Sequence, residues 1–257
     1  MLLGYNTNGL AFHRWQDGLE LLAEVGFRAV AITVDQHCLN PFASNFASEL
    51  AEMRRTLERL QLRSVIETGA RFLLDPRQKH EPTLISSTAE QRSRRVDFLC
   101  RCVDIVKELN SDAVSFWSGV WRMGTLACPS SAAAESGKSA QPPESAWQWL
   151  LDGCRRVTDY AEQRGVQLAF EPEPGMLVET NEQYGQLAEQ VGSPRFGLTI
   201  DIGQRSTSAM CSASSPARSP ITYGDGRSRL AMSTSRTCDA EFTSICDSAT
   251  GRSTSRR

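Results

Sequence analysis

The sequence is poor in lysine and histidine, which narrows the kinds of partner that the protein can have. Only three of its 28 basic residues are lysines, it has three histidines, and its formal net charge is −2. A protein that binds nucleic acid or an anionic membrane through charge carries a basic surface, so this composition gives no reason to expect either partner. Three histidines also leave little material for a histidine-rich zinc cluster.

Long hydrophobic runs and closely paired cysteines are missing as well. No stretch approaches the roughly 18–20 apolar residues of a membrane span, and the opening MLLGYNTNGLAFHRW is too polar for a signal peptide. The eight cysteines are scattered and include no C-x-x-C pair, which favours reduced thiols over disulfides or a structural zinc site. We therefore expect a cytoplasmic protein with no membrane partner.

From residue 1 to about residue 203 the sequence alternates between strand and helix patterns. Short apolar runs predict strands at 2–5, 29–34, 64–67, 113–117, 166–171 and 196–201. Apolar residues at helical spacing predict helices at 15–26, 48–60, 89–110, 144–165 and 181–192. Repeated βα units of about 30 residues predict right-handed crossovers and a parallel sheet.

Six such units fit two α/β architectures, a doubly wound sheet or three quarters of a (β/α)₈ barrel. The dinucleotide-binding form of the first has G-x-G-x-x-G after its first strand, where this chain has GYNTNG. The sequence therefore favours an incomplete, TIM-barrel-like α/β fold of about six βα units. Residues 69–87 predict a long loop, and a Ser-, Ala- and Pro-rich stretch at 119–143 predicts a passive insertion rather than a lid.

The composition changes abruptly after residue 203. Residues 205–257 contain one leucine, no valine and no lysine, and Ser, Thr and Arg make up 28 of these 53 residues. We expect residues 1–203 to form the partial barrel and residues 204–257 to be an unstructured, low-complexity tail that cannot bury enough apolar surface to fold. A natural disordered tail and a shift of the reading frame near residue 204 both stay open, and the abruptness of the change favours the second.

Two acidic strand ends form the most informative motif. LAFEPEPG brings Glu171 to the end of the strand at 166–171, and LTIDIG brings Asp201 to the end of the strand at 196–201. Carboxylates at the carboxyl ends of neighbouring barrel strands converge on the mouth of the barrel, where they can bind a divalent cation that prefers oxygen ligands. The alternative is structural, with each acid capping the next helix or pairing with an arginine.

These motifs, together with GYNTNGL near the start and LLAEVGFRAVAIT at 21–33, resemble the xylose isomerase-like TIM barrel superfamily of sugar (phosphate) isomerases and epimerases over residues 3–203. The resemblance implies that Glu171 and Asp201 are metal ligands and that Glu171 is also the catalytic acid/base group. It further implies a His on strand seven and a Glu on strand eight, which the sequence after Asp201 does not supply at strand ends. Gln204 stands where the family has the His of D-x-G-H, so the expected site is incomplete.

The implied chemistry is proton transfer at a carbon next to a carbonyl, with a small carbohydrate as substrate and Mn²⁺, Mg²⁺ or Co²⁺ as cofactor. Because half of the expected ligand set is missing, we expect this activity to be impaired in the chain. An inactive fragment without catalytic function is the alternative, and an abasic-site endonuclease-like hydrolase is a weaker one. Assembly into a homo-oligomer stays open.

Other polar residues near the predicted strand ends are candidates for substrate contacts. We expect four substrate-binding residues, namely Glu173, Glu179, His13 and Gln204. Each has an ordinary alternative, such as a solvent-exposed acid, a first-turn acid favoured by the helix dipole, or a plain loop residue. Weaker candidates of the same kind are Glu67, His37 and Trp117.

Overall fold

The computed structural model describes residues 2–121 and 143–200, and within these ranges strands and helices alternate as the sequence predicts. The strands are β1 (Gly4–Asn6), β2 (Ala29–Thr33), β3 (Arg63–Glu67), β4 (Val114–Phe116), β5 (Leu168–Phe170) and β6 (Phe196–Leu198). The α-helices are α1 (Trp15–Val25), α2 (Phe46–Leu60), α3 (Ala89–Leu109), α4 (Ser145–Arg164) and α5 (Asn181–Val191), and a short 3-10 helix η1 spans Thr7–Leu10. The tail predicted at 204–257 and most of the insertion predicted at 119–143 lie outside the described residues.

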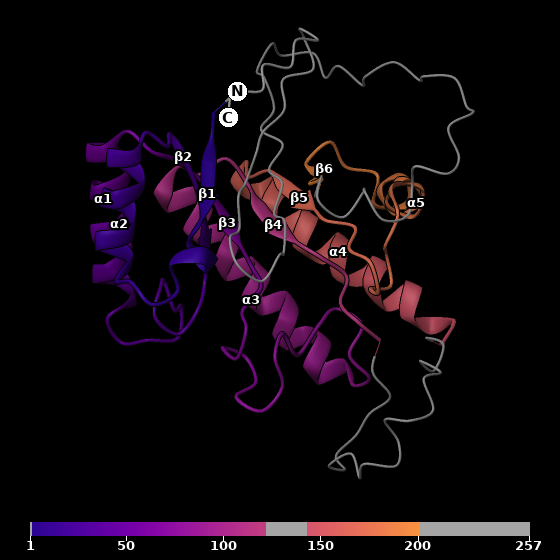
Figure 1. The fold of residues 1–257 in the computed structure, drawn as a ribbon. Coiled ribbons are helices and arrows are strands. Elements are labelled where there is room, and N and C mark those ends of the chain that lie inside the picture. Colours follow the sequence, from indigo (N-terminus) through magenta and orange to yellow (C-terminus); the bar gives the residue numbers. More distant parts are fainter. Residues whose placement is uncertain (1, 122–142, 201–257) are drawn as a thin grey trace, which may run out of the picture.

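The six strands form one parallel sheet in the order β1-β2-β3-β4-β5-β6. Neighbours in the sheet are therefore neighbours in the chain, as in a barrel, whereas a doubly wound sheet reverses its order at a switch point. Figure 1 shows β3 to β6 following one another, with α1 and α2 beside the first strands and α5 beside the last. The fold is that of an incomplete TIM barrel, and the doubly wound alternative is excluded.

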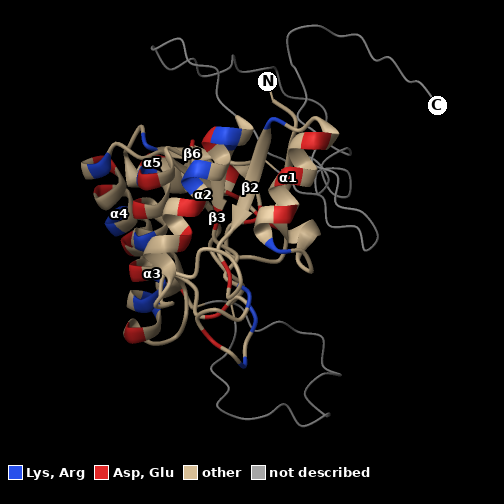
Figure 2. Cartoon of the chain, turned by 90° about the vertical axis from the view of Figure 1, so that its left-hand side faces the viewer, with Lys and Arg blue, Asp and Glu red and all other residues tan. Residues whose placement is uncertain are grey.

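The two faces of the sheet differ in the side chains that they carry. Alternate strand residues, such as Val30 and Ile32 on β2 and Phe170 on β5, join the buried helix residues in one continuous apolar core. On the opposite face, Ala31 and Val65 form a small separate apolar cluster. Charged residues of both signs lie along the helices, and the strands are almost free of charge (Figure 2). The main core therefore lies between the sheet and its helices.

Local signals set the helix ends close to the predicted positions. Thr88 and Thr180 each accept a hydrogen bond from the backbone of a glutamine three residues later, and the glutamine side chain bonds back to form a capping box. The helices α1, α4 and α5 end at a glycine in the left-handed conformation, namely Gly26, Gly165 and Gly192. Because the strands are parallel and each helix runs back from the carboxyl end of one strand toward the amino end of the next, helix N-termini and strand carboxyl ends share one edge of the sheet.

The segment between β3 and α3 contributes to the apolar core. Leu73, Leu74, Leu84 and Ile85 are all buried in it. The predicted loop at 69–87 is confirmed, since no helix or strand lies between β3 and α3. The irregular spacing of its apolar residues gave no sign that tertiary contacts would bury them. No helix in the described ranges has the length and the apolar character needed to cross a membrane.

Candidate active site

Polar side chains gather where the first three strands end on the inner face, the face of the sheet opposite the helices. Asn6, Thr33 and Glu67 are the last residues of β1, β2 and β3. In the register, Thr33 pairs with Glu67, and Asn6 pairs with Ala31, two residues before Thr33, so all three side chains share one face. Thr33 Oγ1 lies 2.7 Å from Glu67 Oε2 and 3.1 Å from Asn6 Oδ1. The three residues form a hydrogen-bonded line across the carboxyl ends of neighbouring strands.

Backbone N–H groups hold both ends of the Asn6–Thr33–Glu67 line. Asn6 Oδ1 accepts a hydrogen bond of 2.8 Å from the N–H of Asn8, and Glu67 Oε1 accepts one of 2.9 Å from the N–H of Gly69. Asn6 and Thr33 are 3% and 4% exposed, and Glu67 is half-buried. Because buried polar groups need hydrogen-bond partners, these contacts fix the orientation of all three side chains.

Glu171 and Glu173 follow β5, and each is 8% exposed. The N–H of Glu171 donates to the carbonyl of Phe116 at 2.8 Å, which extends the pairing of β5 with β4 by one residue. Alternation along this extended strand puts Glu171 on the inner face with Ala169. The N–H of Glu173 donates to the carbonyl of Val178 at 3.1 Å, which closes the turn after β5. Both predicted acids are therefore buried near the edge of the sheet that carries the Asn6–Thr33–Glu67 line.

The other predicted site residues have different surroundings. Glu179 is exposed, and its Oε2 accepts a hydrogen bond of 3.0 Å from the N–H of Gly175, so its observed contact stabilises the turn after β5. His13 is exposed in the loop between η1 and α1. Asp201 and Gln204 lie outside the described residues. The substrate-binding roles of Glu173, Glu179, His13 and Gln204 stay predictions.

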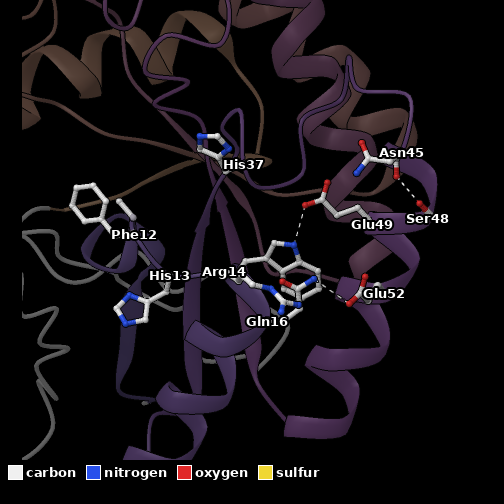
Figure 3. Close-up of a pocket in the computed structure, with 11 residues that line it drawn as sticks. Phe12, His13, Arg14, Gln16, His37, Asn45, Ser48, Glu49 and Glu52 are labelled. Atoms are coloured by element: carbon white, nitrogen blue, oxygen red, sulfur yellow. Dashed lines mark hydrogen bonds between the residues drawn. The ribbon is translucent and has the colours of Figure 1, made fainter.

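His13 borders a cavity of about 520 Å³ between its loop and the N-terminal part of α2. Figure 3 shows two acids of α2, Glu49 and Glu52, pointing toward the start of α1 at the wall of this cavity. Glu49 Oε1 accepts a hydrogen bond of 2.9 Å from Trp15 Nε1, and Glu52 Oε1 accepts one of 3.1 Å from Gln16 Nε2. The volume falls within the range of about 300–1,000 Å³ that is usual for small-molecule sites.

A smaller cavity of about 60 Å³ adjoins the first one and reaches the inner face. The two share four lining residues, among them His37, and the smaller one is also lined by Thr33. Arg71 lies on its wall, 3.7 Å from Asp35 Oδ2 and hydrogen-bonded to Asn8 Oδ1. The smaller cavity therefore lies between the larger cavity and Thr33 of the Asn6–Thr33–Glu67 line.

Arg95 is a buried charge that reasoning from the sequence missed. It is fully buried, and burial lowers the pKa of its guanidinium to about 10. Its Nη2 donates to the carbonyl of Thr68 at 2.8 Å, and its Cζ lies 4.8 Å from the ring centroid of Trp117. Within the described part of the chain, its Nε and Nη1 have no hydrogen-bond acceptor. Its position four residues before Leu99, on the apolar stripe of α3, was the available signal.

Trp117, predicted as a weak candidate for stacking on a sugar, is buried beside Arg95. The ring of His80 meets it edge-on, with the ring centroids 5.5 Å apart. His80 Nδ1 in turn lies 2.6 Å from the carbonyl oxygen of Gly69, next to the end of β3. These contacts make Trp117 a packed residue that supports the carboxyl ends of β3 and β4.

The expected divalent cation needs several oxygen donors close together. Carboxylate oxygens suit Mn²⁺, Mg²⁺ or Co²⁺. Among residues 2–121 and 143–200, no three His, Cys, Asp or Glu side chains lie close enough together to hold a metal ion. Of the predicted pair, Glu171 is described and Asp201 is the first residue beyond the described range. The described part thus supplies one carboxylate of that pair.

Solved structures of sugar epimerases share this fold. D-psicose 3-epimerase, in the presence of D-fructose, matches with a TM-score of 0.61 and 16% identity, over 82% of this chain and 66% of that one. L-ribulose 3-epimerase matches with a TM-score of 0.59 and 16% identity, over 81% and 63%. The 3-keto-D-glucoside 4-epimerase from E. coli matches with a TM-score of 0.60 and 14% identity, over 82% and 72%. This chain spans less than two thirds of the first two structures, and identities this low show a shared fold alone.

The family of the chain follows from its sequence. A comparison with curated proteins gives no match. The xylose isomerase-like TIM barrel family matches residues 19–215, which is more than half of the chain. The parallel strand order and the epimerase structures agree with that match. The chain belongs to the xylose isomerase-like TIM barrel family.

Proposed function

We propose that this chain has the framework of a metal-dependent sugar isomerase or epimerase that moves a proton at a carbon next to a carbonyl. The observation that carries the proposal is Glu171, a buried carboxylate on the inner face directly after β5. Active sites of TIM-barrel enzymes lie at this edge of the sheet. The sugar epimerases that share the fold support a carbohydrate as the substrate.

Glu171 is suited to the role of acid/base group. A carboxylate removes a proton from carbon efficiently when the negative charge that develops on the neighbouring oxygen is stabilised. A divalent cation such as Mn²⁺, Mg²⁺ or Co²⁺, held by Glu171 and Asp201, would supply this stabilisation by polarising the substrate oxygens. Burial of Glu171 limits the access of water to the proton that it takes up.

We propose in addition that the activity is reduced in this chain. Inversion at a carbon needs one proton-transfer group on each side of it. The sequence after Asp201 contains no histidine, and its four acids follow no apolar strand, so the expected remaining ligands have no counterpart there. An inactive fragment is the second candidate. It is favoured by the end strands of the described sheet, because β1 and β6 each pair with one neighbour there.

Exchange of a substrate proton with solvent tests the proposal. The full chain with Mn²⁺ is incubated with D-psicose or D-fructose in D₂O, and NMR measures deuterium at C3. We expect slow exchange with the wild type and a rate at least about 100-fold lower with Glu171→Gln. Glu189→Gln, which changes an exposed acid on α5, should keep the wild-type rate.

Equal rates for Glu171→Gln and the wild type would contradict the role of Glu171. A calorimetric titration with Mn²⁺ separates the two candidates further. Heat of binding that Glu171→Gln abolishes supports the metal-dependent enzyme, whereas a flat titration together with no exchange supports the inactive fragment.

A further inference from the structure

The cavity of about 520 Å³ beside His13 has a wall of mixed chemistry that the proposed function does not use. Its lining residues come from the loop before α1, the start of α1, the loop after β2 and the start of α2. Apart from two histidines, three of them carry a charge, namely Arg14, Glu49 and Glu52. Uncharged polar side chains and two aromatic rings make up most of the rest, so the wall offers both hydrogen-bond donors and acceptors.

The two glutamates of this wall are each held through one carboxylate oxygen. Glu49 Oε1 accepts hydrogen bonds from Trp15 Nε1 at 2.9 Å and from the N–H of Leu39 at 3.2 Å. Glu52 Oε1 accepts one from Gln16 Nε2 at 3.1 Å. Within the described ranges, no hydrogen bond reaches Oε2 of either glutamate. Because the bonded oxygen orients each carboxylate, Oε2 is a positioned acceptor for a hydroxyl group of a ligand.

Phe12 adds a fully exposed aromatic ring to the same wall. Figure 3 shows it beside η1, with Glu49 and Glu52 on α2. The face of an aromatic ring packs well on the C–H groups of a sugar ring, and carboxylates accept hydrogen bonds from the hydroxyl groups of the sugar. An aromatic ring and positioned carboxylates at one cavity are therefore a combination that suits a sugar.

An uncharged sugar fits this wall better than an ion does. The carboxylates of Glu49 and Glu52 repel phosphate and carboxylate groups. A cation is repelled by Arg14, whose ion pair with Asp17 is 3.9 Å long, and it has no acceptor for the amide N–H groups of Asn45. A hydroxyl group both donates and accepts, so a sugar can bond to the donors and to the acceptors of the wall. As far as the described residues extend, the histidines and glutamates here form no metal-binding group of three.

The smaller cavity leads from this wall to the carboxyl edge of the sheet. It lies between the larger cavity and Thr33, the last residue of β2. The strand β5, which precedes Glu171, is three strands away from β2, so about 14 Å lie between the two strand ends along the sheet. One sugar ring in contact with Glu171 therefore does not reach the larger cavity, whereas two linked rings can span the distance.

We propose that the larger cavity binds an uncharged second sugar unit, so that the substrate is a disaccharide or another glycosylated ketose rather than a free monosaccharide. The proposal rests on the proposed function, in which Glu171 acts on the sugar that carries the carbonyl. The attached sugar lies against the ring of Phe12 and donates hydrogen bonds to Glu49 and Glu52. No bond of the substrate forms or breaks in this cavity. Its contacts add binding energy and orient the reacting sugar.

Binding measurements test the second sugar position without any turnover. The full chain with Mn²⁺ is titrated calorimetrically with D-fructose and with lactulose and isomaltulose, disaccharides in which galactose or glucose is attached to fructose. We expect at least one disaccharide to bind about 10-fold more tightly than D-fructose. Phe12→Ala and Glu52→Gln should each remove most of this advantage. Phe42→Ala and Glu189→Gln, which change exposed residues that line neither cavity, should keep it.

Equal affinities for D-fructose and both disaccharides, or no binding of any of them, would overturn the proposal. An advantage that persists in the folded double variant of Phe12→Ala and Glu52→Gln would overturn it as well. Choline that binds where the disaccharides do not would assign the cavity to an organic cation, with the same consequence. Exchange of the fructose C3 proton in D₂O separates this proposal from the proposed function. A tighter-binding disaccharide without exchange in any ketose refutes the proposed function and leaves the sugar-binding cavity, whereas exchange in D-fructose with equal affinities refutes the cavity alone.

Discussion

Replacing Phe170 with alanine should cost about 4 kcal/mol of the free energy of unfolding. Phe170 is fully buried, and its ring centroid lies 5.4 Å from that of Phe116 and 5.6 Å from that of Phe196. Truncation of a buried phenylalanine to alanine costs about 3–5 kcal/mol. Loss of each aromatic pair accounts for about 0.5–1.5 kcal/mol of such a cost. Domains are stabilised by about 5–15 kcal/mol, so the variant should be weakened severely.

Urea denaturation followed by circular dichroism measures this loss from the transition midpoint and slope. Phe12→Ala is the matched control, because it makes the same chemical change at a fully exposed ring and should alter stability by less than about 0.5 kcal/mol. Phe170→Leu keeps most of the apolar volume and should lose less than about 2 kcal/mol. A loss below about 1 kcal/mol in Phe170→Ala, or equal losses at Phe12 and Phe170, would refute the expectation that the packing of Phe170 against Phe116 and Phe196 stabilises β5.

Two further predictions concern the helix ends and the thiols. Thr88→Ala removes the capping box of α3 and should lower the free energy of unfolding by about 1 kcal/mol, whereas Thr88→Ser should leave it almost unchanged. Equal urea midpoints for the two variants would contradict the role of the cap. Burial raises the pKa of the Cys100 thiol from 9.0 to about 11. As the pH rises, the thiol therefore ionises in the unfolded state before it does so in the folded state. The free energy of unfolding is unaffected below pH 9 and falls as the pH rises from 9 to 11. Urea midpoints at pH 8 and pH 10.5 should therefore fall less in Cys100→Ser than in the wild type, and an equal fall would count against this reasoning.

The order of strands and helices could be predicted because each element carries its own local signal. The stripe of α3, for example, is readable from Val96, Leu99 and Val103, and all three are buried. The orientation of Glu171 toward the inner face follows from the alternation of side chains along a strand, which has a period of two residues. The positions of the strands and helices, and of the acid after β5, could therefore be predicted without tertiary information.

The Asn6–Thr33–Glu67 line could not be predicted in the same way. Thr33 is 27 residues from Asn6 and 34 from Glu67, so their contacts depend on the register between three strands. Glu67 was a weak candidate as an acid at a strand end, and Asn6 and Thr33 carried no signal at all. Arg71 and Asp35 also meet only through tertiary structure. The sequence thus predicted the part of the candidate site that lies at one strand end. It did not predict the part in which residues from several strands meet.

The consecutive strand order has a consequence for how the sheet opens and closes. Each strand is hydrogen-bonded to its neighbours in the chain, so the contacts are of modest sequence separation, and one βα unit can detach without breaking contacts between the units beyond it. In the described sheet, β2 to β5 have neighbours on both sides, with β3 and β4 at the centre, and β1 and β6 have one neighbour each. Local opening should therefore begin at the outer strands and proceed inward, with the slowest amide hydrogen exchange in β3 and β4. Motions at the carboxyl edge of the sheet would then come from peeling of the end strands rather than from bending at the centre of the sheet.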